Sequence, residues 1–109
     1  MHSDPKLSER LRKLFADSDL EERVMFGGIA FFLHGNMCVG VYHDKLILRV
    51  GEAAGDKAMA RDHVLPFDIT GRVMLAWIMI EPAGYITARQ LRAWIDKAVT
   101  FVETLPRKY

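Results

Sequence analysis

The chain has 109 residues, half of them hydrophobic, which is enough to build the core of one domain without disulfides or a structural metal. Fifteen Lys and Arg against fourteen Asp and Glu leave a formal net charge of +1, so bulk charge gives no reason to expect binding to nucleic acid or to a membrane. With one cysteine and no apolar run of membrane-spanning length, the sequence predicts a single cytoplasmic domain over residues 1–109.

An N-terminal helix is predicted from Asp4 and Pro5, because the carboxylate can cap free amides and proline tolerates the first helical position. An apolar stripe follows at helical spacing, formed by Leu7, Leu11, Leu14 and Phe15. We expect the helix to end near residues 17–19 and to pack this stripe on the rest of the domain.

Residues 24–50 form short apolar runs separated by turns at 34–36 and 43–45, a pattern typical of a three-stranded antiparallel meander. A register that pairs Leu33 with Met37 and Phe31 with Val39 gives one nearly wholly apolar face, predicted to be the core side. A two-residue turn at Asp44 and Lys45 adds Leu46, Leu48 and Val50 to it. The opposite, mixed face carries Phe26, Gly28, Ala30, Phe32, Cys38, Gly40, Tyr42, Ile47 and Arg49.

The second half predicts a short helix over residues 52–61, weakened by Gly55, and an extended connector at 65–68. Residues 73–80 are apolar at every position, which predicts a strand covered on both faces. Thr87 and Gln90 form a capping box that opens a long C-terminal helix, whose apolar positions are Leu91, Trp94, Ile95, Ala98, Val102 and Leu105.

These elements predict an α+β fold. An antiparallel sheet, made of the three-stranded meander plus one or two further strands, should carry the N-terminal helix and the long C-terminal helix on one face.

A candidate interaction surface lies on the mixed sheet face. Glycines inside strands, here Gly28 and Gly40, either admit a ligand or another backbone, or serve packing. For Gly28 and its neighbour Gly27, packing is the interpretation we favour. Arg49, beside Gly40 in this register, is placed to grip an anion, although pairing with Glu22 or Glu52 is the more ordinary role. The full candidate set is Arg49, Tyr42, Gly28, Gly40, Phe26, Phe32 and, beside a glycine turn, Arg72.

No catalytic, metal or cofactor site is predicted. His34 and His43 stand at opposite ends of one strand, so they cannot share a metal ion, and no Cys-x-x-Cys or His-x-x-x-His spacing occurs. Cys38 lacks an identifiable base, and no pair of carboxylates emerges for acid–base chemistry.

Three segments together resemble the N-terminal domain of the TfoX (Sxy) family. They are Met25-Phe26-Gly27-Gly28, the segment from Gly71-Arg72 to Trp77, and the Trp94-bearing helix that ends in Leu105-Pro106. The resemblance covers almost the whole chain and identifies it as a short, single-domain member. Members of the family include regulators of natural competence, thought to act as transcription coactivators, and these carry a second, C-terminal domain. The family has no agreed catalytic residues.

The resemblance implies a non-enzymatic regulatory or protein-interaction domain. Its partner would be a protein, either of the transcription machinery or a separately encoded C-terminal domain, and a homodimer through an exposed strand edge is a further expectation. Direct sequence-specific DNA binding is not expected, because no groove-reading element or basic excess is present. The alternative is a small-molecule domain that binds an anionic ligand around Arg49.

Overall fold

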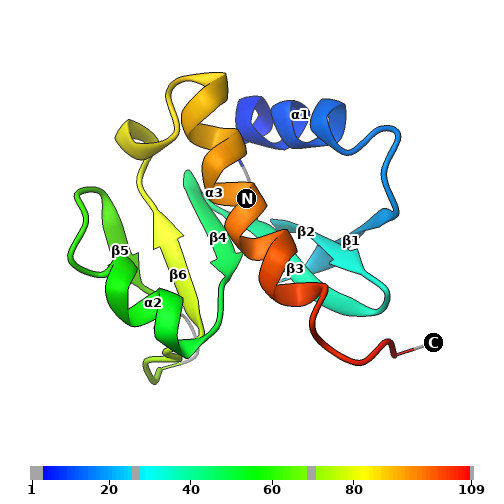
Figure 1. The fold of residues 1–109 in the computed structure, drawn as a ribbon. Coiled ribbons are helices and arrows are strands. Elements are labelled where there is room, and N and C mark those ends of the chain that lie inside the picture. Colours follow the sequence, from blue (N-terminus) through cyan, green and yellow to red (C-terminus); the bar gives the residue numbers. More distant parts are fainter. Residues whose placement is uncertain (1–3, 26–27, 69–70, 109) are drawn as a thin grey trace.

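The computed structural model describes residues 4–25, 28–68 and 71–108, and its elements follow one another as an α+β domain. Figure 1 shows their order: α1 (Pro5–Leu14), β1 (Leu20–Met25), β2 (Gly28–Leu33), β3 (Asn36–Tyr42), β4 (Lys45–Arg49), α2 (Glu52–Ala58), β5 (Val64–Pro66), β6 (Trp77–Ile80), the short 3-10 helix η1 (Pro82–Gly84) and α3 (Ala88–Val102). The predicted fold class, with an N-terminal and a long C-terminal helix, is confirmed.

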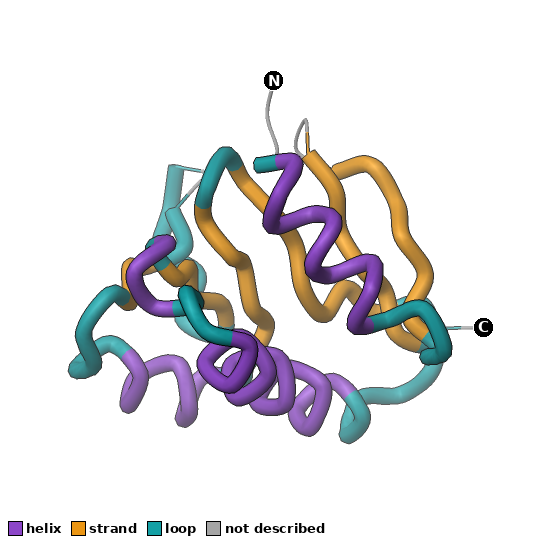
Figure 2. Tube along the Cα trace, turned by 90° about the horizontal axis from the view of Figure 1, so that it is seen from above, coloured by secondary structure: helices purple, strands orange, loops and turns teal. Residues whose placement is uncertain are grey.

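The sheet has the strand order β1-β2-β3-β4-β6-β5, and every neighbouring pair is antiparallel. In Figure 1, α2 and α3 lie in front of it, and the view from above separates this helical layer from the strands (Figure 2). β5 and β6 are the expected further strands. The meander has four strands rather than three, because the charged segment of β1 pairs along the sheet edge, where polar side chains reach solvent.

The register between β2 and β3 contains a bulge. Phe31 pairs with Val39 as predicted, but the next pair is Phe32 with Met37, so the predicted pairing of Leu33 with Met37 is wrong. Cys38 is the extra residue, and a bulge turns the side chains around it. The sulfur of Cys38 therefore joins the main core, and Met37 lies on the opposite face, the reverse of the prediction.

The turn between β3 and β4 also differs by one residue. Tyr42 pairs with Lys45, so the turn residues are His43 and Asp44 instead of Asp44 and Lys45. The core side is unaffected, because Leu46 then pairs with Val41, and side chains two positions apart point to the same face. Leu46, Leu48 and Val50 are buried in the main core, as predicted.

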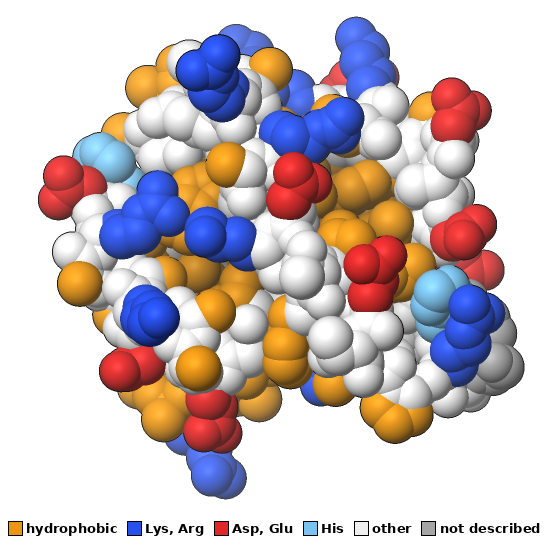
Figure 3. Space-filling view, in the orientation of Figure 1, with side chains coloured by type: hydrophobic (Ala, Val, Ile, Leu, Met, Phe, Trp, Pro, Cys, Tyr) orange, Lys and Arg blue, Asp and Glu red, His pale blue; other side chains and the backbone are white. Residues whose placement is uncertain are grey.

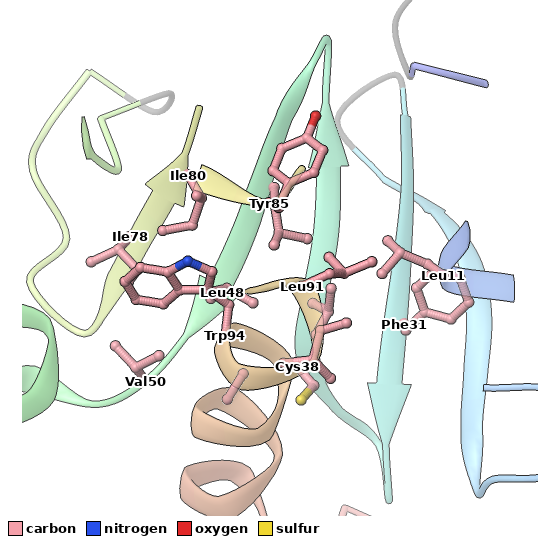
Figure 4. Close-up of a cluster of buried hydrophobic side chains, with 14 of the residues drawn as sticks. Leu11, Phe31, Cys38, Leu48, Val50, Ile78, Ile80, Tyr85, Leu91 and Trp94 are labelled. Carbon is pink, nitrogen blue, oxygen red and sulfur yellow. The ribbon is translucent and has the colours of Figure 1, made fainter. Parts of the chain in front are cut away.

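The main core fills the space between the sheet and the helices, and Figure 4 shows its side chains converging from both layers. α1 contributes Leu7, Leu11 and the following Phe15, whose ring centroid lies 4.9 Å from that of Phe31. α3 begins with the predicted capping box and buries its apolar stripe. The indole Nε1 of Trp94 donates to the carbonyl oxygen of Gly84 at 3.1 Å, so this large ring is buried with its polar atom satisfied.

The prediction of one long buried strand over residues 73–80 is wrong for its first half. β6 begins only at Trp77, because its partner β4 ends at Arg49 and the chain turns there into α2. The Ala76 carbonyl oxygen accepts instead from the amides of Val50 and Gly51. Residues 73–75 consequently have no strand to pair with and reach the surface. The predicted connector at 65–68, by contrast, contributes part of β5.

The segment after α3 is fastened to the turn between β2 and β3. The Nδ2 atom of Asn36 donates to the carbonyl oxygen of Pro106 at 3.0 Å, and the amide of Lys108 donates to the carbonyl oxygen of His34 at 2.9 Å. The C-terminal segment is thereby held at the β1–β3 side of the sheet, on the right in Figure 1. Within the described ranges, no helix is long and apolar enough to cross a membrane.

Candidate functional site

The mixed sheet face forms a second, smaller apolar cluster. It contains Ala30, Phe32, Met37, Ile47, Phe67 and Met79, with Tyr42, Leu65 and Trp77 packed at its margins. The space that Gly40 could leave for a ligand is occupied by a side chain. A Cβ atom built on Gly40 would lie 2.8 Å from the terminal methyl carbon of Met37. Gly40 thus makes room for the methionine that the bulge brings to this face.

Arg49 is half-buried on the same face, beside its strand partner Trp77. The guanidinium carbon lies 5.3 Å from the centroid of the indole six- and five-membered ring system, a cation–π arrangement. Its Nε atom is buried and has no hydrogen-bond partner within the described residues. Among the described residues Arg49 forms no ion pair with either Glu22 or Glu52. Both carboxylate oxygens of Glu22 accept from Arg12 instead.

The other predicted residues of this face are covered or engaged locally. The Arg23 guanidinium lies 4.3 Å from the ring centroid of Phe32, and Tyr42 contacts the His43 ring edge-on at 4.4 Å between centroids. Gly28 is buried and pairs with Met25 at the first position of β2. Phe26 lies outside the described residues.

Arg72 is exposed on the loop before β6. It is related to Arg49 through Trp77. Arg49 stacks on this indole, and Arg72 lines a hollow of about 600 Å³ together with it. The structure therefore brings Arg49, Trp77 and Arg72 into one neighbourhood at the start of β6.

The most exposed apolar segment of this neighbourhood was not predicted from the sequence. We call it the apolar rib, and it consists of Val73, Met74 and Leu75. Their exposed fractions are 55%, 39% and 61%. Apolar side chains in an unbroken row normally indicate a buried strand, which is why the pattern predicted burial. The one signal against it was the glycine turn immediately before the row.

The rib is held in place through its backbone. The amide of Met74 donates to the carbonyl oxygen of Phe67, and the amide of Trp77 donates to that of Met74, both at 3.0 Å. Beneath the rib, a Cβ atom on Gly55 would lie only 2.3 Å from the carbonyl oxygen of Leu75. Because glycine has no side chain, α2 can approach the rib backbone closely enough to support it.

Hollows lie on both sides of the rib. The first is the 600 Å³ hollow with Arg72, which also includes Glu52 at the start of α2. The second, of about 220 Å³, is lined mainly by apolar side chains, among them Met59, Pro66 and Trp77. The Trp77 ring in this lining stacks on the ring of Phe67, with centroids 5.5 Å apart. A fixed apolar ridge between two hollows has the shape and chemistry of a docking surface.

The described residues hold no arrangement suited to catalysis at the one thiol. Burial raises the pKa of the Cys38 thiol to about 12, so the sulfur stays protonated and is a poor nucleophile at neutral pH. No group of three or more His, Cys, Asp or Glu side chains in the described ranges is placed to hold a metal ion.

The described residues thus form a small α+β domain with an exposed apolar ridge beside two hollows. A family model for the TfoX N-terminal domain matches residues 10–102, most of the chain. The protein belongs to the TfoX N-terminal domain family, which is not known to be enzymatic and which indicates a regulatory or interaction domain. Searches of curated proteins and of solved structures gave no match.

Proposed function

We propose that the chain is a non-enzymatic regulatory domain of the cytoplasm that binds a protein partner through the apolar rib. The single observation that carries the proposal is that three consecutive large apolar side chains are exposed on a backbone fixed from below. Isolated exposed apolar residues are common on soluble proteins, but a contiguous patch usually marks an interaction site. A pre-formed patch also loses little conformational entropy on binding.

The partner we propose is a different protein that presents apolar side chains to the rib, in keeping with the transcription-coactivator role expected from the family. Glu52 and Arg72 on the rim of the larger hollow supply one charge of each sign, which would orient such a partner. The competing occupant of the rib is a second copy of this chain. Measuring both partner binding and the mass of the free domain distinguishes a different protein from a second copy.

The test compares capture from native lysate by the wild-type domain, by a rib variant and by a control. The rib variant is Val73→Ser with Leu75→Ser. The control is Val24→Ser with Ile86→Ser, which removes two apolar residues that are even more exposed (80% and 69%) from other surfaces. A partner identified by mass spectrometry, purified and mixed again, should bind the wild type and the control and lose at least about tenfold in affinity for the rib variant.

Light scattering of the free domain completes the test. A wild-type dimer that the rib variant abolishes would assign the surface to self-association and contradict a different partner. Equal binding of a purified partner to wild type and rib variant would remove the rib from the proposal.

A second candidate function, binding of a small anion, is favoured by the buried Nε atom of Arg49 that has no hydrogen-bond partner in the described structure. An anion placed beside it would accept that hydrogen bond and neutralise the charge. Thermal unfolding with inorganic phosphate or with small carboxylates tests this candidate. Stabilisation that Arg49→Lys removes would support it, and none at millimolar concentrations would contradict it.

A further inference from the structure

A second hollow system lies on the other side of α2, between α2 and α3. One hollow of about 120 Å³ has Val50 and Ile78 as its buried floor and Ala54 and Ala58 on the α2 side. The short alanine side chains leave the apolar floor open. We use the name α2–α3 groove for this hollow together with the adjoining one that shares Arg61 with it.

Cationic side chains surround this apolar floor. Lys57, Arg61 and Lys97 form the rim of the hollow. A neighbouring hollow of about 550 Å³ shares Arg61 and adds Arg89 and His63. Figure 3 shows Lys and Arg side chains gathered over hydrophobic surface on the left of the view, where α2 and α3 lie in Figure 1.

The helical spacing of the cations explains why they converge. Arg89 and Lys97 are eight residues apart on α3, with Ala93 halfway between them, so all three lie on one side of that helix. Lys57 and Arg61 are four residues apart at the end of α2 and just beyond it. Two short rows of positive charge therefore face each other across the groove.

These charges have little internal compensation. Asp62 is the one carboxylate among the residues that line the two hollows. Within the described part of the chain, none of the four cations Lys57, Arg61, Arg89 and Lys97 takes part in a salt bridge. Arg61 lies over the Trp94 ring at 4.2 Å, which holds its guanidinium at the junction of the two hollows. The acidic residues of α2, Glu52 and Asp56, line the hollows beside the rib.

The size of the 120 Å³ hollow determines what it can hold. Pockets for whole cofactors or drug-sized ligands measure roughly 300–1,000 Å³. A hollow well below that range accommodates a single side chain, while the cations around it select negative charge. We propose that the α2–α3 groove binds an acidic peptide segment of a partner protein, with one aliphatic side chain on the Val50–Ile78 floor and flanking carboxylates on Lys57, Arg61, Arg89 and Lys97.

This inference goes beyond the proposed function, because it assigns a separate surface on the opposite side of α2 and a partner chemistry of its own. The rib recognises apolar surface, whereas the groove recognises negative charge flanking one apolar residue. Either assignment can therefore fail while the other holds.

The test begins with a displayed library of random dodecapeptides selected on the full chain. Enriched peptides should carry Asp or Glu on both sides of a Leu, Ile, Val or Met, and their affinity should fall as salt is added. One enriched peptide, synthesised with a fluorescent label, is then titrated against variants of the protein. Selection of peptides without acidic residues, or no selection at all, would overturn the proposal.

Three variants locate the site. Lys57→Glu with Lys97→Glu reverses two exposed groove charges and should weaken binding of the labelled peptide by at least about tenfold. Lys13→Glu with Arg107→Glu makes the same change in net charge at exposed positions that line neither hollow and should have little effect. Ala54→Leu covers the floor without altering charge and should also weaken binding. Circular dichroism checks that each variant is folded.

Two results would reject the groove at this stage. One is equal affinity of the labelled peptide for the groove variant and the control. The other is displacement of the peptide by a short single-stranded oligonucleotide at lower concentration than by the unlabelled peptide, which would make nucleic acid the better occupant. The rib variant Val73→Ser with Leu75→Ser should bind the peptide as the wild type does, and loss of binding there would place the peptide on the rib.

Discussion

The carbonyl oxygen of Leu75 lies where a side chain on Gly55 would have to be, with only 2.3 Å between that oxygen and an ideal Cβ atom. The backbones of the rib and of α2 therefore approach each other more closely than any side chain at position 55 would allow. Gly55 weakens α2 as a helix, but the rib can lie where it does only because this position is a glycine.

Gly55→Ala should destabilise the domain, although alanine is the better helix former by about 1 kcal/mol. The added methyl group meets backbone and not a flexible side chain, so the rib or α2 must shift, at a net cost of about 1–3 kcal/mol. Urea unfolding followed by circular dichroism measures this change. An increase in stability would show that the contact is loose, and Ala53→Gly, at an exposed position of α2, provides the matched comparison for helix propensity alone.

Gly40→Ala should be much better tolerated, despite a similarly close contact. The atom in the way is the terminal methyl carbon of Met37, and a methionine side chain can adjust its outer torsions. We expect a loss within about 1 kcal/mol in the same urea experiment. Gly40→Val should lower the free energy of unfolding clearly more, because Met37 cannot move far enough to accommodate a branched side chain. Equal losses of stability for Gly40→Ala and Gly40→Val would show that the fit between Gly40 and Met37 does not determine the cost.

Cys38 should make stability fall at alkaline pH. Burial raises its pKa from 9.0 to about 12, so the folded protein keeps the proton that the unfolded chain releases. The stabilisation is complete below pH 9.0 and declines as the pH rises toward 12. The Cys38→Ala variant should therefore lose less free energy of unfolding than the wild type over this interval, and parallel curves would refute the assignment. Tyr85, whose pKa is also raised to about 12, is present in both proteins.

The pair formed by Arg12 and Glu22 should contribute little to stability, even though it joins α1 to β1 through two hydrogen bonds of 2.9 and 2.8 Å. Both side chains are substantially exposed, and exposed ion pairs typically contribute about 0–1 kcal/mol. The hydrogen bonds from Arg12 lower the pKa of Glu22, so this small stabilisation is present above the carboxyl's ordinary value of 4.5 and is lost as the pH falls below it.

A double-mutant cycle with Arg12→Ala and Glu22→Ala measures the coupling directly. We expect a value below about 1 kcal/mol that shrinks at high salt. A coupling free energy above this value that does not change with salt would contradict the prediction. It would mean that solvent does not screen the charges of Arg12 and Glu22.

The sequence predicted most reliably the parts in which local signals and burial agree. The Asp4 cap of α1 and the Thr87 capping box of α3 each introduce an amphipathic stripe, and both helices begin where expected. Their ends come earlier than predicted: α1 ends at Leu14 and not near residues 17–19, and α3 ends at Val102, before Leu105. The alternation of β2 and β4 likewise placed Phe31 and Leu48 on the core side.

The errors arose where long-range pairing decides the outcome. The bulge at Cys38 cannot be inferred from alternation, because inserting one residue reverses the faces of its neighbours without changing composition. The exposure of the rib depends on where β4 ends, which is a property of another segment. The α2–α3 groove depends on two cation rows facing each other, and helical spacing defines a face but not what lies opposite it.

The anchoring of residues 106 and 108 to the β2–β3 turn has a practical consequence for experiments. In Figure 1 the C-terminal segment and α2 lie on opposite sides of the domain. An attachment made at the C-terminal end would therefore emerge on the side away from α2. Coupling the domain to a sensor surface through that end would leave both the rib and the α2–α3 groove turned toward the solution. An attachment at α2 would obstruct them.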